Sequence, residues 1–161
     1  MTKIRTFALT AILMLTLAGC GKADQEWLTV YSFSGENEQF TVSNGVVVLT
    51  DTEEIFDGGD LKITGDLLAD ITSYTTTFYM MTDNGKEVIL SNSVEDMTGG
   101  TVNVPGDLGR VSGDGILIPV KIDDTSDLEN SLYFELTTVD KTGVEDVYQL
   151  QMSLTEITKN N

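Results

Sequence analysis

The sequence predicts an all-β protein, a two-sheet antiparallel β-sandwich of about nine or ten short strands. Three observations indicate this fold class. Apolar and polar residues alternate with a period of two in several segments, which is the pattern of a half-buried strand. Glycine, asparagine and aspartate mark turns between these segments. No segment after residue 20 has the period of an amphipathic helix. Immunoglobulin-like topology is the commonest form of such a sandwich, and we expect it here.

The clearest hairpin lies near the end of the chain. Leu132, Phe134 and Leu136 alternate with polar residues, and the apolar residues of 148–154 do the same. Between these segments, residues 140–143 end with Gly143, and glycine adopts a positive φ at little steric cost. We therefore predict a terminal hairpin in which 148–154 is one strand.

Two Asn-Gly pairs predict two further hairpins. Asn44-Gly45 separates 40–42 from 46–49, and Asn84-Gly85 separates 74–81 from 88–90. Both residue types tolerate the left-handed backbone conformation that a tight type I′ turn requires. Additional strands are expected at 28–33, 61–63, 101–104 and 116–122.

The composition fits one globular domain with an unusual charge. The chain has 161 residues, 40% of them hydrophobic, so it is long enough to bury a core. It carries 26 acidic and nine basic residues, a formal net charge of −17. Phosphate backbones are bound through Lys and Arg, so this acidity argues against a nucleic-acid partner.

The residues that are missing exclude several chemistries. The sequence contains no histidine and a single cysteine, Cys20. Ser-His-Asp triads, Cys-His pairs and imidazole metal ligands therefore cannot form, and neither can an intrachain disulfide. We do not expect this chain to be an enzyme.

The first 20 residues have the organisation of an export signal. Lys3 and Arg5 make a basic start, residues 6–16 are mostly apolar, and Ala18 and Gly19 are the small residues that a signal peptidase requires. The apolar stretch is short for a permanent membrane span, which needs roughly 20 residues.

Leu17-Ala18-Gly19-Cys20 resembles the lipobox of bacterial lipoproteins. The resemblance implies cleavage between Gly19 and Cys20 and attachment of diacylglycerol to the Cys20 thiol. It divides the chain into a signal peptide at 1–19, a lipidated tether at 20–26 and a β-sandwich domain at 27–161. The expected location is the extracytoplasmic face of the cell membrane. An ordinary secretory signal and an uncleaved transmembrane anchor are the alternatives.

The rest of the chain also resembles small, uncharacterised lipoproteins from the surface of Gram-positive bacteria. Two segments carry this resemblance, one from Trp27 to Asp60 that includes Asn44-Gly45 and Gly58-Gly59, and one at 91–100. The resemblance implies a place at the cell surface and no particular activity.

The acidic loops are candidate cation sites. Hard cations such as Ca²⁺ take about six to eight oxygen ligands, which closely spaced carboxylates supply. The helix-loop-helix calcium motif is missing, and solvated acidic loops account for the same residues. The candidate calcium ligands are Asp57, Asp60, Asp123, Asp124 and Asp127; no other cofactor is expected.

These observations favour a lipid-anchored, non-enzymatic binding or accessory module with a protein or glycan partner. A calcium-binding adhesive sandwich is the first alternative. A carbohydrate-binding domain or a small glycosidase that depends on a pair of carboxylates is the second. Trp27, Tyr31, Phe33, Tyr79, Tyr133 and Tyr148 are candidate platform aromatics, although filling the core is their more ordinary role.

Overall fold

The computed structural model describes residues 28–65, 68–117 and 130–158 and confirms the all-β sandwich. The predicted signal peptide and tether, including Cys20, lie outside these ranges. The described part of the chain forms ten strands: β1 (Leu28–Glu36), β2 (Phe40–Thr50), β3 (Glu54–Asp57), β4 (Asp60–Ile63), β5 (Ile71–Thr82), β6 (Gly85–Glu95), β7 (Arg110–Gly113), β8 (Leu132–Asp140), β9 (Glu145–Gln151) and β10 (Ser153–Glu156).

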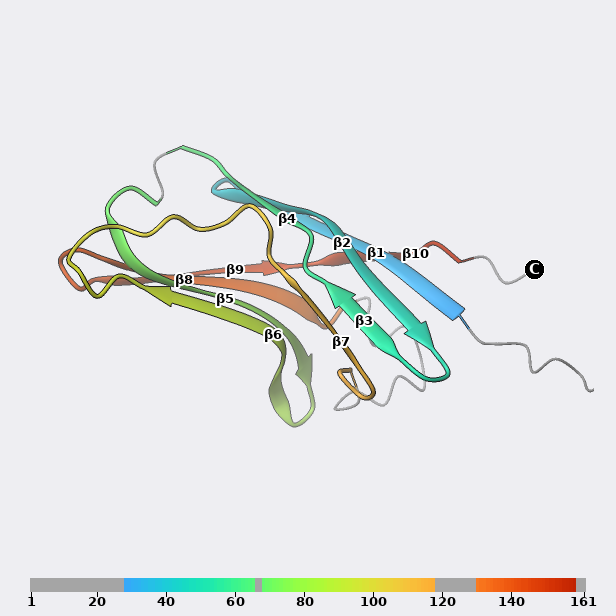
Figure 1. Cartoon of the computed structure of the whole chain (residues 1–161). Coiled ribbons are helices and arrows are strands. Elements are labelled where there is room, and N and C mark those ends of the chain that lie inside the picture. Colours follow the sequence, from blue (N-terminus) through green and yellow to red (C-terminus); the bar gives the residue numbers. More distant parts are fainter. Residues whose placement is uncertain (1–27, 66–67, 118–129, 159–161) are drawn as a thin grey trace, which may run out of the picture.

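The strands form two antiparallel sheets packed against each other (Figure 1). The larger sheet has the order β10-β1-β2-β3-β7, with β4 also paired to β2. The smaller sheet has the order β6-β5-β8-β9. This is the order of the C′, C, F and G strands in an immunoglobulin variable domain. In the larger sheet, the consecutive strands β1, β2 and β3 lie side by side in the middle. β10 forms the edge beside β1, and β7 forms the edge beside β3.

Alternation along each strand builds the core between the sheets. In β8, Leu132, Phe134 and Leu136 point inward and are buried, while the residues between them are half-buried. Aromatic rings join the two layers: Phe78 of β5 lies 5.1 Å from Phe56 of β3 and 5.0 Å from Phe134, measured between ring centroids. Burial of such large apolar side chains is the main favourable contribution to folding.

Two of the three predicted hairpins are confirmed. β5 and β6 are joined at Asp83-Asn84, with Thr82 paired to Gly85. β8 and β9 are joined by the turn after Asp140, whose side-chain oxygen Oδ1 accepts hydrogen bonds from the backbone N–H groups of Thr142 and Val144. These side-chain contacts fix the turn locally, as expected for an aspartate at this position.

The hairpin predicted at Asn44-Gly45 is wrong, because β2 runs through both residues without turning. Phe33 of β1 pairs with Gly45 and Gly35 pairs with Val42, so β2 carries one more residue than β1 in this interval. That is a β-bulge, and Asn44 has the left-handed φ of 60° that one type of bulge requires. The actual turn between β1 and β2 is at Asn37, whose Oδ1 accepts hydrogen bonds from the N–H groups of Gln39 and Phe40.

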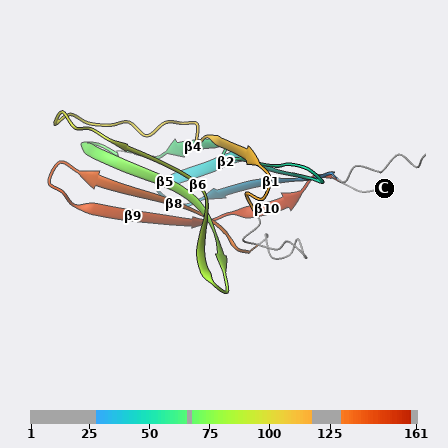
Figure 2. The same ribbon diagram turned by 60° about the horizontal axis from the view of Figure 1, so that its bottom comes forward.

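The single strand predicted at 148–154 is two strands in different sheets. β9 pairs with β8 in the smaller sheet, and β10 pairs with β1 in the larger one. The chain passes between the layers at Met152, which is buried and donates its N–H to the carbonyl of Leu132 (Figure 2). The alternation of apolar residues continues through the change because both strands bury one face in the same core.

Of the other expected strands, one does not form and another lies mostly outside the described residues. Residues 101–104 are not a strand, although Val102 donates its N–H to the carbonyl of Ile71 and packs on the core. Of 116–122, only Ile116 and Leu117 are described, and they lie in a bend with Leu117 buried. The four-residue strands β3 and β7 are additional to the predicted ones. Within the ranges described above, no helix has the length and apolar character needed to cross a membrane.

Candidate functional site

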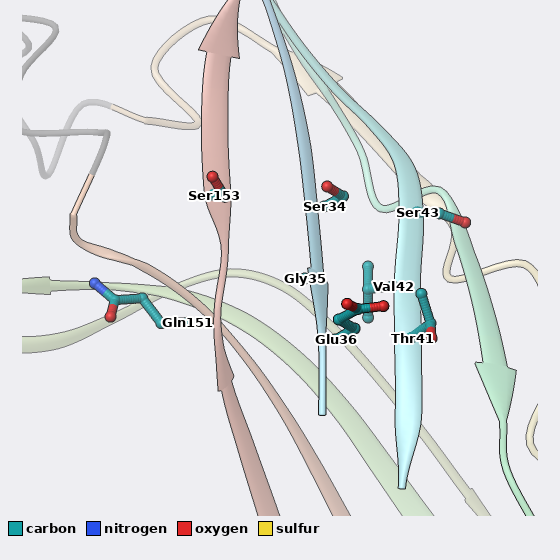
Figure 3. A pocket seen from close by; sticks show the side chains of 8 residues that line it. All are labelled: Ser34, Gly35, Glu36, Thr41, Val42, Ser43, Gln151 and Ser153. Carbon is teal, nitrogen blue, oxygen red and sulfur yellow. The ribbon is translucent and has the colours of Figure 1, made fainter. Parts of the chain in front are cut away.

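An open surface pocket of about 510 Å³ lies where the chain passes from β9 to β10. We call it the exchange pocket. Figure 3 shows its residues on three neighbouring segments: β1 in the middle, the first half of β2 on one side, and the chain at Gln151 and Ser153 on the other. The residues that line it are Ser34, Gly35, Glu36, Thr41, Val42, Ser43, Gln151 and Ser153.

The change of sheet creates this pocket. β10 pairs with β1 only as far as Ser34, which lies opposite Ser153. Beyond that point β9 belongs to the other sheet, while β1 continues to Glu36. The end of β1 is therefore left without a strand neighbour on that side, and the space beside it is the pocket.

Gly35 keeps the pocket wall thin. A β-carbon at this position would lie 2.5 Å from Cε of Met152 and 3.1 Å from the carbonyl oxygen of Gln151. A side chain here would therefore press on the crossing segment. Val42 is fully buried and anchors this part of β2 in the core.

The other lining groups are rich in hydrogen-bond acceptors. The lining residues include four with a hydroxyl group, one carboxamide and one carboxylate, and no Lys or Arg is among them. The Gln151 amide is directed away from β1 and β2 (Figure 3), and its Nε2 donates to the carbonyl oxygen of Asn130 at 2.8 Å.

Two charged residues flank the pocket on β4. Asp60 pairs in register with Ser43, and Lys62 pairs with Thr41. Thr41 in turn pairs with Glu36 of β1, so Glu36 and Lys62 are two strands apart. That is a backbone separation of roughly 10 Å, and no ion pair joins these two described side chains.

A second polar group, the tyrosine cluster, lies on the smaller sheet outside the core. The rings of Tyr79 and Tyr133 stack with centroids 5.5 Å apart, and Lys86 Nζ lies 4.1 Å from the centroid of Tyr79. Lys86 also contacts Glu135 Oε1 at 2.7 Å, and Gln149 Nε2 donates to Glu135 Oε2 at 2.8 Å.

The electrostatics of this cluster follow from these contacts. Burial of the Glu135 carboxyl opposes its ionisation, but the hydrogen bonds from Lys86 and Gln149 and the Lys86 charge outweigh it and lower the pKa of Glu135. Burial, and then the charge of Glu135, raise the pKa of Tyr79. Tyr79 is only 2% exposed, and the polar groups of the cluster bond to one another. We interpret the cluster as structural because it offers little ring surface to a ligand.

The structure places only part of the predicted calcium site. Asp57 ends β3 and its Oδ1 accepts a hydrogen bond from the N–H of Gly59, while Asp60 Oδ2 accepts one from Asn44 Nδ2 at 2.7 Å. The acidic segment 51–60, which was expected to be a loop, thus contains the strand β3. No group of three or more acidic or cysteine side chains suited to a metal occurs among the residues that the structure describes. Asp123, Asp124 and Asp127 lie outside those residues, as do Gly19 and Cys20.

The candidate aromatic platform is largely accounted for by packing. Tyr31 and Phe33 are buried in the core, and Tyr148 packs against it near Phe40. Trp27 lies outside the described residues.

Sequence reasoning missed the exchange pocket. Its hydroxyl residues alternate with buried ones along β1 and β2, so a shared outer face was readable from the sequence. The sequence does not show that β9 belongs to the other sheet, because β9 and β10 have one continuous alternation pattern.

No protein-family model matches this chain, and comparison with curated proteins and with solved structures gave no significant match.

Proposed function

We propose that this chain is a lipid-anchored module on the extracytoplasmic face of a bacterial membrane, with a binding or accessory role and no catalytic activity. The observation that carries the proposal is the sequence Leu17-Ala18-Gly19-Cys20, placed directly after a basic start and a short apolar stretch. Cys20 is the only cysteine of the whole chain, and it is the residue that lipidation requires.

The arrangement of the fold is compatible with a tether at the amino-terminal end. The described structure begins at Leu28, soon after Cys20 in the sequence. β1 begins at one end of the sandwich, beside the end of β10, and the β8–β9 turn lies at the opposite end (Figure 1). A lipid on Cys20 would hold the first end near the membrane and leave the second end facing away.

The exchange pocket supports binding in preference to hydrolysis. Glycoside hydrolysis uses two carboxyl groups on opposite sides of the scissile bond. The pocket contains only Glu36 as an acidic lining residue. It offers several hydrogen-bonding groups around a small volume, which suits recognition of a ligand.

Replacement of Cys20 tests the proposal. We expect the wild-type protein, expressed in a bacterial host with labelled palmitate, to take up the label and to sediment with membranes. Cys20→Ser removes the thiol with little change in size, and we expect it to lose the label. Gly19→Ala, which keeps a small residue at the cleavage point, is the control and should retain it.

The alternatives give different results. An uncleaved transmembrane anchor would leave even the wild-type protein unlabelled, in the membrane and at full precursor mass. An ordinary secretory signal would leave even the wild-type protein unlabelled in the soluble fraction. Either result would contradict lipid anchoring.

A further inference from the structure

We infer that the exchange pocket binds a primary ammonium group carried by a small molecule, with Glu36 as its charged partner. This inference deepens the binding role proposed above and rests on it. It depends on three properties of the pocket: its construction, the chemistry of its walls and the charge of the whole chain.

The pocket is a feature of the fold and not a gap between mobile side chains. Backbone segments of β1, β2 and the β9–β10 crossing form its floor, and it is open to solvent on the outer side. Its volume of about 510 Å³ lies within the range of small-molecule sites. Gly35 and the buried Val42 and Met152 keep its inner side rigid, since Met152 fills the space that a larger residue at position 35 would need.

The walls accept hydrogen bonds from a cation. An ammonium group has three N–H donors and no acceptor. Glu36 offers a carboxylate, and the hydroxyl residues Ser34, Thr41, Ser43 and Ser153 add further acceptors to the lining. A hydrogen bond between a charged donor and a carboxylate is about twice as strong as one between neutral groups.

Anionic and flat aromatic ligands fit less well. Phosphate or carboxylate groups need Lys, Arg or clustered backbone N–H donors, and no basic residue lines the pocket. No aromatic side chain lines it either, so nothing there would stack on a planar ligand or on a sugar face. A ligand held mainly by an ammonium group has neither requirement.

The charge of the chain favours the same ligands. A net charge of −17 attracts cations over a distance of about a Debye length. Near the pocket, Asp60 adds to this attraction and Lys62 opposes it. Both lie on β4, directly opposite the lining residues Ser43 and Thr41 of β2. Long-range attraction alone would depend equally on any neighbouring carboxylate, whereas a specific site would depend on Glu36. This contrast makes the inference testable.

Calorimetric titration of the full-length protein in detergent tests it with three probes. Spermidine and glucosamine present primary ammonium groups on a chain and on a sugar ring, and they distinguish a polyamine from an amino sugar. Glucose has a similar ring without the ammonium group. We expect at least one of the two amines to bind at physiological salt and glucose not to bind.

The matched variants are Glu36→Gln and Glu38→Gln. Both remove one negative charge, and Glu38 is an exposed residue of the same β1–β2 turn region that does not line the pocket. Glu36→Gln should weaken amine binding about tenfold, the usual loss when a charged hydrogen-bond partner is removed. Glu38→Gln should leave the affinity within about twofold. Circular dichroism checks that both variants keep their strand content.

Several outcomes would overturn the inference. Equal weakening by the two variants would show a diffuse cation atmosphere and no specific site. Binding of glucose as tight as that of glucosamine would assign the pocket to hydroxyl recognition. No binding of either amine would also refute it. Mass measurement of the Cys20 peptide on the same samples reports lipidation separately, so failure here is distinguishable from failure of the proposed anchoring.

Discussion

At the scale of single residues, two glycines share one backbone conformation in different surroundings. Gly59 and Gly65 have φ values of 70° and 72°, a left-handed region that is costly for other residues. A β-carbon on Gly65 would meet nothing within 4 Å, whereas one on Gly59 would lie 2.2 Å from the carbonyl oxygen of Ser43 and 2.6 Å from the N of Gly45. The requirement for glycine is therefore conformational at Gly65 and also steric at Gly59.

This comparison predicts two different losses of stability. Gly65→Ala should lower the free energy of unfolding by about 1–2 kcal/mol, the cost of a left-handed alanine. Gly59→Ala should lower it by about 3 kcal/mol or more, because backbone atoms of β2 must also move. Urea denaturation of both variants measures the difference. Equal losses would contradict the close approach of β2 and the β3–β4 turn.

Glu135 gives the protein a defined acid sensitivity. Its pKa is lower in the folded protein than its ordinary value of 4.5. Folding is therefore favoured by its ionised form at pH values above the ordinary value, and this contribution is lost as the pH falls through the folded pKa. At pH 7 we expect Glu135→Gln to cost about 0.5–1 kcal/mol, as for partly exposed ion pairs.

The loss should become smaller at low pH. Urea denaturation near pH 7 and near pH 3 measures it, with the exposed Glu145→Gln on β9 as the control. A stability difference between wild type and Glu135→Gln that stays the same at both pH values would contradict the role given to Lys86 and Gln149.

At the scale of elements, Asn44-Gly45 shows where local sequence signals become ambiguous. A tight hairpin turn and a β-bulge both need a residue with positive φ, and Asn satisfies either. What decides between them is distant in sequence: Asn44 Nδ2 donates to Asp60, and a β-carbon on Gly45 would lie 2.1 Å from a ring carbon of Phe33. The hairpins at β5–β6 and β8–β9 were predictable because their turn residues interact locally.

The bulge predicts an order of stability among variants of Asn44. Asn44→Ala loses the contact with Asp60 and places alanine at a φ of 60°, so we expect a loss of about 1–2 kcal/mol in the free energy of unfolding. Asn44→Gly loses the same contact but relieves the backbone, so its loss should be smaller. Thermal or urea unfolding ranks the two. An alanine variant as stable as the glycine variant would contradict the bulge.

The exchange pocket was beyond prediction for a related reason. It requires β9 and β10 to join different sheets, yet the residues around Met152 alternate without interruption. Alternation tells which face of a strand is buried, and it does not tell which sheet the strand extends. The fold class was therefore predictable, whereas the place at which the chain changes sheet was not.

At the scale of the whole molecule, several aromatic contacts between the two sheets meet at Phe78. Phe78 contacts Phe33 and Phe56 of the larger sheet and Phe134 of its own. Phe78→Ala should cost about 3–5 kcal/mol, the usual loss for a large buried side chain, and Phe78→Leu should cost less. Urea denaturation measures both. A loss below about 1 kcal/mol for the alanine variant would show that the sheets do not depend on this contact.

The whole chain also has a charge that opposes its compact state. The net charge of −17 repels itself, and added salt screens this repulsion. We therefore expect the melting temperature to rise when NaCl is raised from about 10 mM to about 200 mM. Sodium sulfate at equal ionic strength is the control for specific ion effects. A melting temperature that falls with both salts would contradict this view of the charge.

Attachment to the membrane is the property on which the biological account depends. Mass spectrometry of the amino-terminal peptide, taken from the protein purified from its own membranes, tests it most directly. We predict a peptide that begins at Cys20 and carries the mass of a diacylglyceryl group on its sulfur. A peptide that still joins Gly19 to Cys20, or a Cys20 thiol of unmodified mass, would contradict the account.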